Sequence, residues 1–253
     1  MQRTCRGILL AYHTELFCFL PVLAVVLARD PAGLPQSVAG NAGAPIVDDQ
    51  GVFVISMAGR PVGSETFKIR SSLGRIEARG EIRLNLQRDG KTVSMQSFPD
   101  LVLDSQFRPV TYAWRLHGPH SSRLEVDFRS PPAKARYYTI NGSEDDRDFQ
   151  LPPDVVVLDD NVIHHFQLIM ARFQTLGGEK QTFRVFVPQE ALPSLITVEE
   201  MKDAATPAGA AAPALRHFLI TTDVTHVDLW VDNQQHVEHV SVPAVQLDAV
   251  RRN

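Results

Sequence analysis

The chain has 253 residues, of which 44% are hydrophobic, and this suffices for one sizeable domain or two small ones with a real core. Its 25 basic and 29 acidic residues give a formal charge of −4 without a basic cluster, which argues against nucleic-acid binding. Both cysteines, Cys5 and Cys18, lie near the N-terminus, so the rest of the chain holds no disulfide framework, thiol nucleophile or thiolate metal site.

Residues 1–28 have the layout of a secretory signal peptide. Arg3 and Arg6 precede an apolar run of 13 residues that ends at Ala28, and a basic start before an apolar stretch of this length is typical of export. Cleavage after Ala28 is the expected outcome, and retention as an uncleaved membrane anchor is the alternative. We therefore predict an exported protein of the periplasm or cell envelope, in which residues 29–46 form a flexible tether.

Strand-like runs fill the chain from residue 51 to residue 151. The clearest is Ile76–Leu86, where apolar or small residues alternate with polar ones without a break. Such period-two alternation predicts a long antiparallel strand with one wet face. Asp89-Gly90 and Asn141-Gly142 are hairpin signals, so sequence neighbours should pair antiparallel. Further strands are expected at 51–58, 63–70, 92–103, 109–117, 122–129, 135–140 and 147–151.

The segment from Asp159 to Phe173 carries the helical signal, and we place a central helix at 160–175. Large apolar residues at 162, 163, 166, 169, 170 and 173 form one stripe of a 3.6-residue period. Asp160 or Asn161 can cap the start of this helix, and the glycines at 177 and 178 end it. Further apolar residues on the opposite side indicate that more than one surface covers the helix.

After the helix the chain returns to strand-like sequence. An Ala- and Pro-rich stretch at 203–214 is expected to be a loop, and a short amphipathic helix or tail is expected at the C-terminal end, residues 246–253. About ten strands against one helix predict a mainly β fold, in a single domain over residues 47–245. We expect a large curved antiparallel sheet or half-open barrel, with the central helix covering the concave face. The later strands are predicted at 181–187, 194–199, 216–222, 226–231 and 237–242.

The order of these elements resembles a known kind of protein. Glycine-rich first strands over Gly51–Phe67, a long meander, and a mid-chain helix over Asp159–Arg172 resemble the bacterial DUF3108-type proteins. Those proteins are similar in turn to the curved-sheet lipoprotein carriers of the LolA/LppX kind. The resemblance covers residues 50–245 and implies a curved-sheet fold and binding of an apolar ligand in the cell envelope. It transfers no catalytic residue.

No motif of the sequence names a reaction. In a suitable strand–turn–helix setting the sequence contains no nucleophile elbow, HExxH zinc motif, P-loop or dinucleotide fingerprint. We therefore predict no cofactor and no dedicated metal site. His164 and His165 are adjacent on the helix and point about 100° apart, so they cannot chelate one ion from a single turn. We interpret them as boundary residues satisfied by water or backbone. The enzyme alternative, a metal-dependent hydrolase, needs three ligands to converge from His117, His120, His164, His165, His217, His226, His236, His239 or a nearby carboxylate.

The leading hypothesis is a non-enzymatic protein that binds a lipid or another apolar small molecule in a groove between sheet and helix. Such a groove works by the hydrophobic effect and needs no fixed polar constellation. An envelope protein partner is the other expected partner, and a scaffold that pairs through its sheet edges is a further alternative. Membrane association is expected only through an uncleaved leader. The candidate groove residues are Tyr112, Trp114, Phe128, Phe166, Ile169, Met170 and Phe173.

Overall fold

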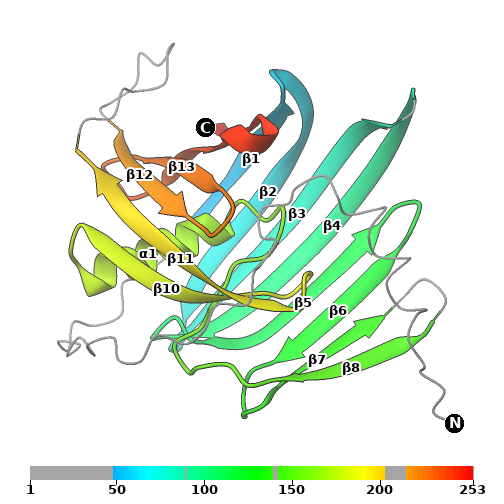
Figure 1. Cartoon of the computed structure of the whole chain (residues 1–253), viewed down its shortest axis with the longest axis horizontal. Helices are drawn as coiled ribbons and strands as arrows, with labels where there is room; N and C mark the ends of the chain where they lie inside the picture. The colour runs from blue at the N-terminus through cyan, green and yellow to red at the C-terminus, as the bar shows by residue number, and fades with distance from the viewer. Residues whose placement is uncertain (1–47, 89, 139–141, 203–214, 253) are drawn as a thin grey trace, which may run out of the picture.

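The computed structural model describes residues 48–88, 90–138, 142–202 and 215–252. The predicted leader, tether and Ala/Pro-rich loop lie outside these residues. The described chain forms one 15-stranded sheet with a single α-helix inside its curve (Figure 1). The elements are β1 (Asp49–Met57), β2 (Arg60–Ser72), β3 (Arg75–Arg88), β4 (Lys91–Asp104), β5 (Pro109–His117), β6 (Ser122–Asp127), β7 (Ala133–Tyr138), β8 (Glu144–Phe149), β9 (Val156–Val157), α1 (His165–Leu176), β10 (Lys180–Val187), β11 (Leu192–Met201), β12 (Arg216–Thr221), β13 (His226–Val231), β14 (Val237–Val242), the 3₁₀ turn η1 (Pro243–Val245) and β15 (Leu247–Arg252).

Two meanders make up the sheet, and one strand pair joins them. Strands β1 to β8 follow one another from the middle of the sheet to one end, and β15 to β9 follow one another to the other end. The pairing of β1 with β15 connects the two halves, and all pairs are antiparallel except β9 with β10. The predicted antiparallel architecture is therefore confirmed. The alternation over Ile76–Leu86 is confirmed as well, with Ile76, Ala78 and Ile82 fully buried on the inner face of β3.

The two ends of the sheet approach each other without pairing. Phe149 of β8 packs on Phe186 of β10, with 4.8 Å between the ring centroids. The hydroxyl of Tyr137 on β7 donates to the carbonyl of Pro188 at 3.0 Å. A sheet of this many strands has to twist and curl, and here the curl brings its ends together into a half-open barrel, as predicted.

Helix α1 lies in the concavity of this sheet and is covered on several sides (Figure 1). Every residue from His165 to Ala171 is buried, which an exposed amphipathic helix would not show. The Gln167 side chain ties the helix to the start of β14. Its amide nitrogen donates to the carbonyl of Gln235 at 2.8 Å, and its oxygen accepts from the backbone N–H of Val237 at 2.8 Å. The N–H of Val237 is a buried backbone group that needs such a partner, and the carbonyl of Gln235 is half-buried.

Three boundary predictions need correction. The helix begins at His165, not at residue 160, and His164 occupies the N-cap position without its side chain capping the helix. The last residues, predicted as a helix or tail, include β15, where Leu247 and Ala249 face the core and hold the two halves of the sheet together. The described residues form fifteen strands, more than the estimate of about ten, and thirteen of them correspond to the ranges expected from the sequence. Apart from β15, the strand that was missed is β9, whose two residues are too few to show a period.

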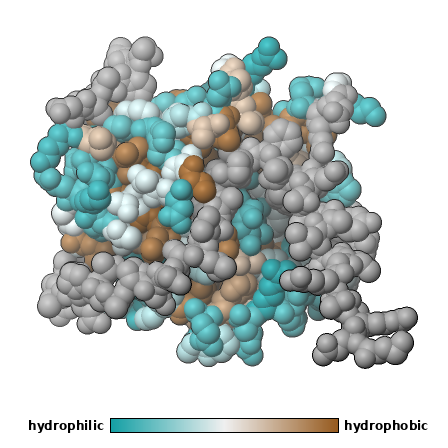
Figure 2. Space-filling model, in the orientation of Figure 1, coloured by the Kyte–Doolittle hydropathy of each residue, from teal (hydrophilic) through white to brown (hydrophobic). Residues whose placement is uncertain are grey.

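Hydrophobic residues gather toward the middle of the face seen in Figure 2, and hydrophilic residues dominate its rim. This distribution follows from the curl, since the inner face of the sheet is visible only through the opening between its two halves. Within the described part of the chain, no helix has the length and apolar character needed to cross a membrane.

Candidate functional site

A buried carboxylate from the sheet holds the start of α1 in place. Glu65 of β2 is 0% exposed. Its two oxygens accept the backbone N–H groups of Ile163 at 2.7 Å and His164 at 2.8 Å. A carboxylate at this position satisfies two amides of the turn that leads into the helix, and it lies near the positive end of the helix dipole. The cap thus comes from a residue about a hundred positions away, and the helix starts where Glu65 can reach it.

The histidine pair lies inside this network and not at a boundary with water, so our interpretation of the pair was wrong. Both rings are 0% exposed. The Nδ1 of His164 lies 2.6 Å from Glu65, and its ring is parallel to Phe67, with 5.8 Å between centroids. The Nδ1 of His165 accepts the backbone N–H of Asp159 at 3.1 Å. Burial, followed by the neighbouring His164, holds the pKa of His165 well below its ordinary value, so this ring is neutral.

Asp159 is the second buried carboxyl of the segment. It accepts the hydroxyl of Tyr112 on β5 and the backbone N–H of Gln189 at 2.9 Å. Burial raises the pKa of Asp159 to about 6, and these hydrogen bonds oppose the rise. Burial and the nearby Asp159 carboxyl raise the pKa of Tyr112 well above its ordinary value. Residues 159–164 are therefore pinned to β2, β5 and the turn after β10, which makes this irregular segment part of the rigid core.

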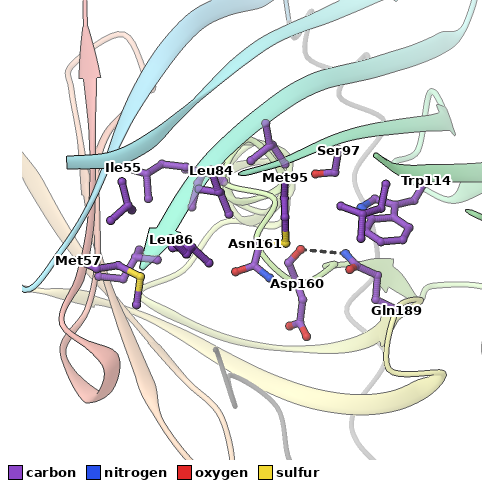
Figure 3. A pocket seen from close by; sticks show the side chains of 15 residues that line it. Ile55, Met57, Leu84, Leu86, Met95, Ser97, Trp114, Asp160, Asn161 and Gln189 are labelled. Carbon is purple, nitrogen blue, oxygen red and sulfur yellow. Dashed lines mark hydrogen bonds between the residues drawn. The ribbon is translucent and has the colours of Figure 1, made fainter. Parts of the chain in front are cut away.

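A cleft opens between this pinned segment and the inner face of the sheet. It has a cavity volume of about 70 Å3. Figure 3 shows Leu84 and Met95 on one side of the cleft and Asp160 and Asn161 on the other. Leu84 of β3 and Met95 of β4 are directly paired across the two strands and only half-buried. The complete lining comprises Ile55, Met57, Val62, Ile82, Leu84, Leu86, Met95, Ser97, Trp114, Leu116, Asp160, Asn161, Ile163, Gln189 and Leu247.

A smaller hollow of about 40 Å3 lies on the other side of the same segment. Asp160, Asn161 and Ile163 line both spaces and form their common wall. Phe166 of α1 and Ile220 of β12 contribute apolar surface to the second space. The segment before the helix thus separates two hollows, one facing each half of the sheet.

The polar groups of the two hollows are acidic or neutral, and none of the described residues that line them is a lysine, arginine or histidine. Burial is the main cause that raises the pKa of Asp160 to about 9, and the charge of Asp159 and the carboxyl group of Glu190 add to it. The Gln189 amide nitrogen donates to the backbone carbonyl of Asp160 at 2.9 Å (Figure 3). At neutral pH the cleft therefore holds a protonated carboxylic acid beside apolar side chains.

The structure separates the predicted groove residues into three groups. Trp114 lines the larger cleft and Phe166 the smaller one. Phe128 is half-buried and packs edge-on against Phe186 at 6.2 Å, away from both spaces. The other four are buried in the core, where Tyr112 joins the hydrogen-bond network and the rest fill space: Tyr112, Ile169, Met170 and Phe173.

Sequence reasoning missed the lining residues Leu84, Met95 and Gln189. Leu84 had a usable signal, because it belongs to the alternating run of β3 and lies near the end of that strand, beyond the part that the helix segment covers. Met95 had a signal too, because the two-residue Asp89-Gly90 hairpin pairs Arg88 with Lys91 and therefore Leu84 with Met95. Gln189 had none, since its position depends on the turn after β10.

The histidines do not assemble the metal centre that the enzyme alternative requires. In the described ranges, one group of three potential ligands lies within 4.8 Å, namely Asp232, His236 and Glu238, and it contains a single histidine. Arg251 occupies the same region and pairs with Asp49, with its Nε 3.8 Å from Glu238. A fixed arginine beside the carboxylates neutralises them and competes with a cation.

The remaining histidines of that set are accounted for by local structure or lie apart. His217 and His239 flank the ring of Trp230 on neighbouring strands, at centroid distances of 5.0 and 4.6 Å. Each also contacts an aspartate, at 2.8 Å for His217 with Asp228 and 2.9 Å for His239 with Asp248. The set therefore does not converge on one ion position.

Comparisons with known proteins support the fold and give no function. No protein-family model and no curated protein matches the chain. Among solved structures, it is similar to a β-barrel-like protein of the domain of unknown function DUF1849 from Brucella abortus. The TM-score is 0.55 and the identity 8%, over 83% of this chain and 97% of that chain. At this identity the similarity shows the fold alone.

A second solved structure is a DUF1089 family protein from Pseudomonas aeruginosa, with 14% identity over 84% of this chain and 98% of that chain. Its TM-score of 0.43 is too low to carry an argument. Neither description is of the DUF3108 or LolA/LppX kind. The comparisons thus support a related curved-sheet fold.

Proposed function

We propose that this protein is exported to the cell envelope and binds a lipid or another apolar molecule in the cleft beside residues 160–163. The observation that carries the proposal is the half-buried, paired side chains of Leu84 and Met95, which face a cavity of about 70 Å3. Apolar surface left uncovered inside a fold is stabilised when a ligand removes it from water.

The buried network favours binding because it holds the cleft open in advance. Glu65 and Asp159 anchor the segment that forms one wall, and the long strands β3 and β4 form the other. A ligand entering such a site need not order a loop, so less of its binding free energy is lost to conformational entropy. This arrangement suits a binding protein and assigns no residue a chemical step.

Sequence features support the cellular location and the kind of ligand. A basic start followed by an apolar run at residues 1–28 is the basis for export. The resemblance to DUF3108 proteins and LolA/LppX-type carriers makes a lipid the expected ligand. The scaffold alternative has less support, because the edge strand β8 carries five charged residues among its six, and charged edges resist the addition of another strand.

Binding of the neutral apolar fluorophore N-phenylnaphthylamine tests the proposal. Met95→Trp fills the cleft, and Met201→Trp places the same bulk at a surface position that is 38% exposed. We expect the cleft variant to weaken binding at least about tenfold, the equivalent of about 1.4 kcal/mol, and the surface variant to leave it unchanged. Circular dichroism checks that both variants fold. Equal binding by wild type and the cleft variant would exclude this cleft as the site.

A further inference from the structure

The polar end of the cleft has an uncompensated acidic character. Asp160 lines both hollows, Asp159 lines the smaller one, and the carboxyl group of Glu190 is within hydrogen-bonding reach of Asp160. Among the described residues, no basic side chain lines either space. Carboxyl groups in proteins are normally paired with a cation or left in water. Here Asp160 lies at the edge of an apolar cavity, with Asp159 in the adjoining hollow and the exposed Glu190 beside it.

We propose that the ligand of this cleft carries a cationic ammonium head, which contacts Asp160, and an apolar body, which lies between Leu84 and Met95. The inference rests on the proposed function and specifies the chemistry of its ligand. Charge complementarity selects the head group, since Asp160 is the acidic side chain in the lining of this cleft and the described lining offers no basic side chain to pair with an anion. The apolar side chains of Leu84 and Met95, on the side of the cleft opposite Asp160 in Figure 3, select the apolar body of the ligand.

The side-chain amides of Asn161 and Gln189 also suit an ammonium head group. An ammonium group has hydrogen-bond donors and no acceptor, so it needs several oxygen atoms around it. Asn161 lies next to Asp160 in the lining, and the side-chain amide of Gln189 closes the same side of the cleft (Figure 3). The cavity of about 70 Å3 has room for roughly five to seven water-sized groups at about 10–15 Å3 each, which suits a short alkyl chain.

Binding of a cation should also change the protonation of Asp160. Burial, Asp159 and Glu190 keep this carboxyl protonated at neutral pH in the free protein. An ammonium ion beside it favours the charged form, so the carboxyl loses its proton when the ligand binds. A general attraction of cations to an acidic protein releases no proton, and proton release therefore distinguishes the site from nonspecific binding.

Three probes with the same octyl chain test the inference: octylammonium, octanol and octanoate. Each is titrated near neutral pH as a competitor of the bound fluorophore, and octylammonium is also titrated by calorimetry in two buffers of different ionisation enthalpy. We expect octylammonium to bind about tenfold or more tighter than octanoate and to release close to one proton, consistent with a charged hydrogen bond at the head group. Asp160→Asn should remove both the preference and the proton release, and Glu190→Gln, which keeps Asp160, should retain the preference.

Asp223→Asn is the matched control, because it makes the same charge change at an exposed residue. It should leave the preference and the proton release intact. If octanol or octanoate displaces the fluorophore as well as octylammonium does, the ammonium inference fails and the apolar-ligand proposal stands. If none of the three displaces it, the ammonium inference fails, and the proposed function is decided separately by the loss of fluorophore binding in Met95→Trp. A preference that persists in Asp160→Asn places the cation elsewhere and overturns the assignment.

Discussion

Glu65→Gln should destabilise the protein more than any other single change to a carboxylate on the sheet. The Oε1 atom of Glu65 accepts the backbone N–H of His164 and contacts the Nδ1 of the same residue, and the Oε2 atom of Glu65 accepts the backbone N–H of Ile163. A glutamine can keep its oxygen at only one of these positions, so its amide N–H groups face a backbone donor at the other. The lost charged hydrogen bond and the unpaired buried N–H together predict a loss of about 3 kcal/mol.

Urea denaturation followed by circular dichroism measures this loss. For a domain of this size, about 3 kcal/mol corresponds to a melting temperature lower by roughly 6–12 °C. Glu125→Gln is the control, since Glu125 is exposed on β6 and its nearest cation, Arg123, is 3.7 Å away. It should change stability by less than about 0.5 kcal/mol. A loss below about 1 kcal/mol for Glu65→Gln would refute the role of Glu65 as the anchor of the helix.

Other predictions concern packing, the helix anchor and pH. Gly80→Ala places a Cβ 2.8 Å from the ring of His164, so the free energy of unfolding should fall by about 1–3 kcal/mol. Gly118→Ala is the control, because its Cβ would lie 3.4 Å from the nearest atom, and it should lower stability much less. Equal losses in the two variants would contradict the close packing at Gly80. Gln167→Leu removes the partner of the buried Val237 N–H and of the half-buried Gln235 carbonyl, and it should lower stability by about 2 kcal/mol. It should also speed amide hydrogen exchange in α1, and unchanged exchange would contradict the anchoring role of Gln167. Because the pKa of Asp160 is raised to about 9, the folded state holds the extra proton. Its stability should therefore fall as pH rises from about 6.5 to 8.5, by as much as about 1.4 kcal/mol per pH unit. Asp160→Asn should make stability less dependent on pH. Equal slopes of stability against pH in wild type and variant would contradict the raised pKa of Asp160.

Local patterns in the sequence were sufficient to predict the sheet and the presence of the helix. The alternation over Ile76–Leu86 predicted β3 because one face of that strand is buried and the other is wet. The stripe from residue 162 to residue 173 predicted α1, and its apolar residues are indeed buried. The predicted start of the helix at residue 160 was wrong. The Asp160 and Asn161 caps were plausible locally, but Glu65 competes for the same amides from another strand.

The candidate site was predicted in outline and missed in detail for the same reason. Trp114 and Phe166 were predicted as residues of the apolar groove, and they line the two hollows. The position of the empty space depends on where the helix segment stops covering the sheet. That boundary is set by contacts across long sequence separations, including Asp159 with Tyr112. A single sequence contains no periodic signal for such contacts.

The central claim is that an apolar molecule occupies the cleft between the paired side chains of Leu84 and Met95 and the segment at residues 160–163. Anomalous diffraction from crystals soaked with bromohexane tests it most directly, because the bromine marks the ligand without a polar head. We predict a bromine peak inside this cleft in wild-type protein and its loss in Met95→Trp. Peaks found only on the outer surface of the protein would contradict the claim.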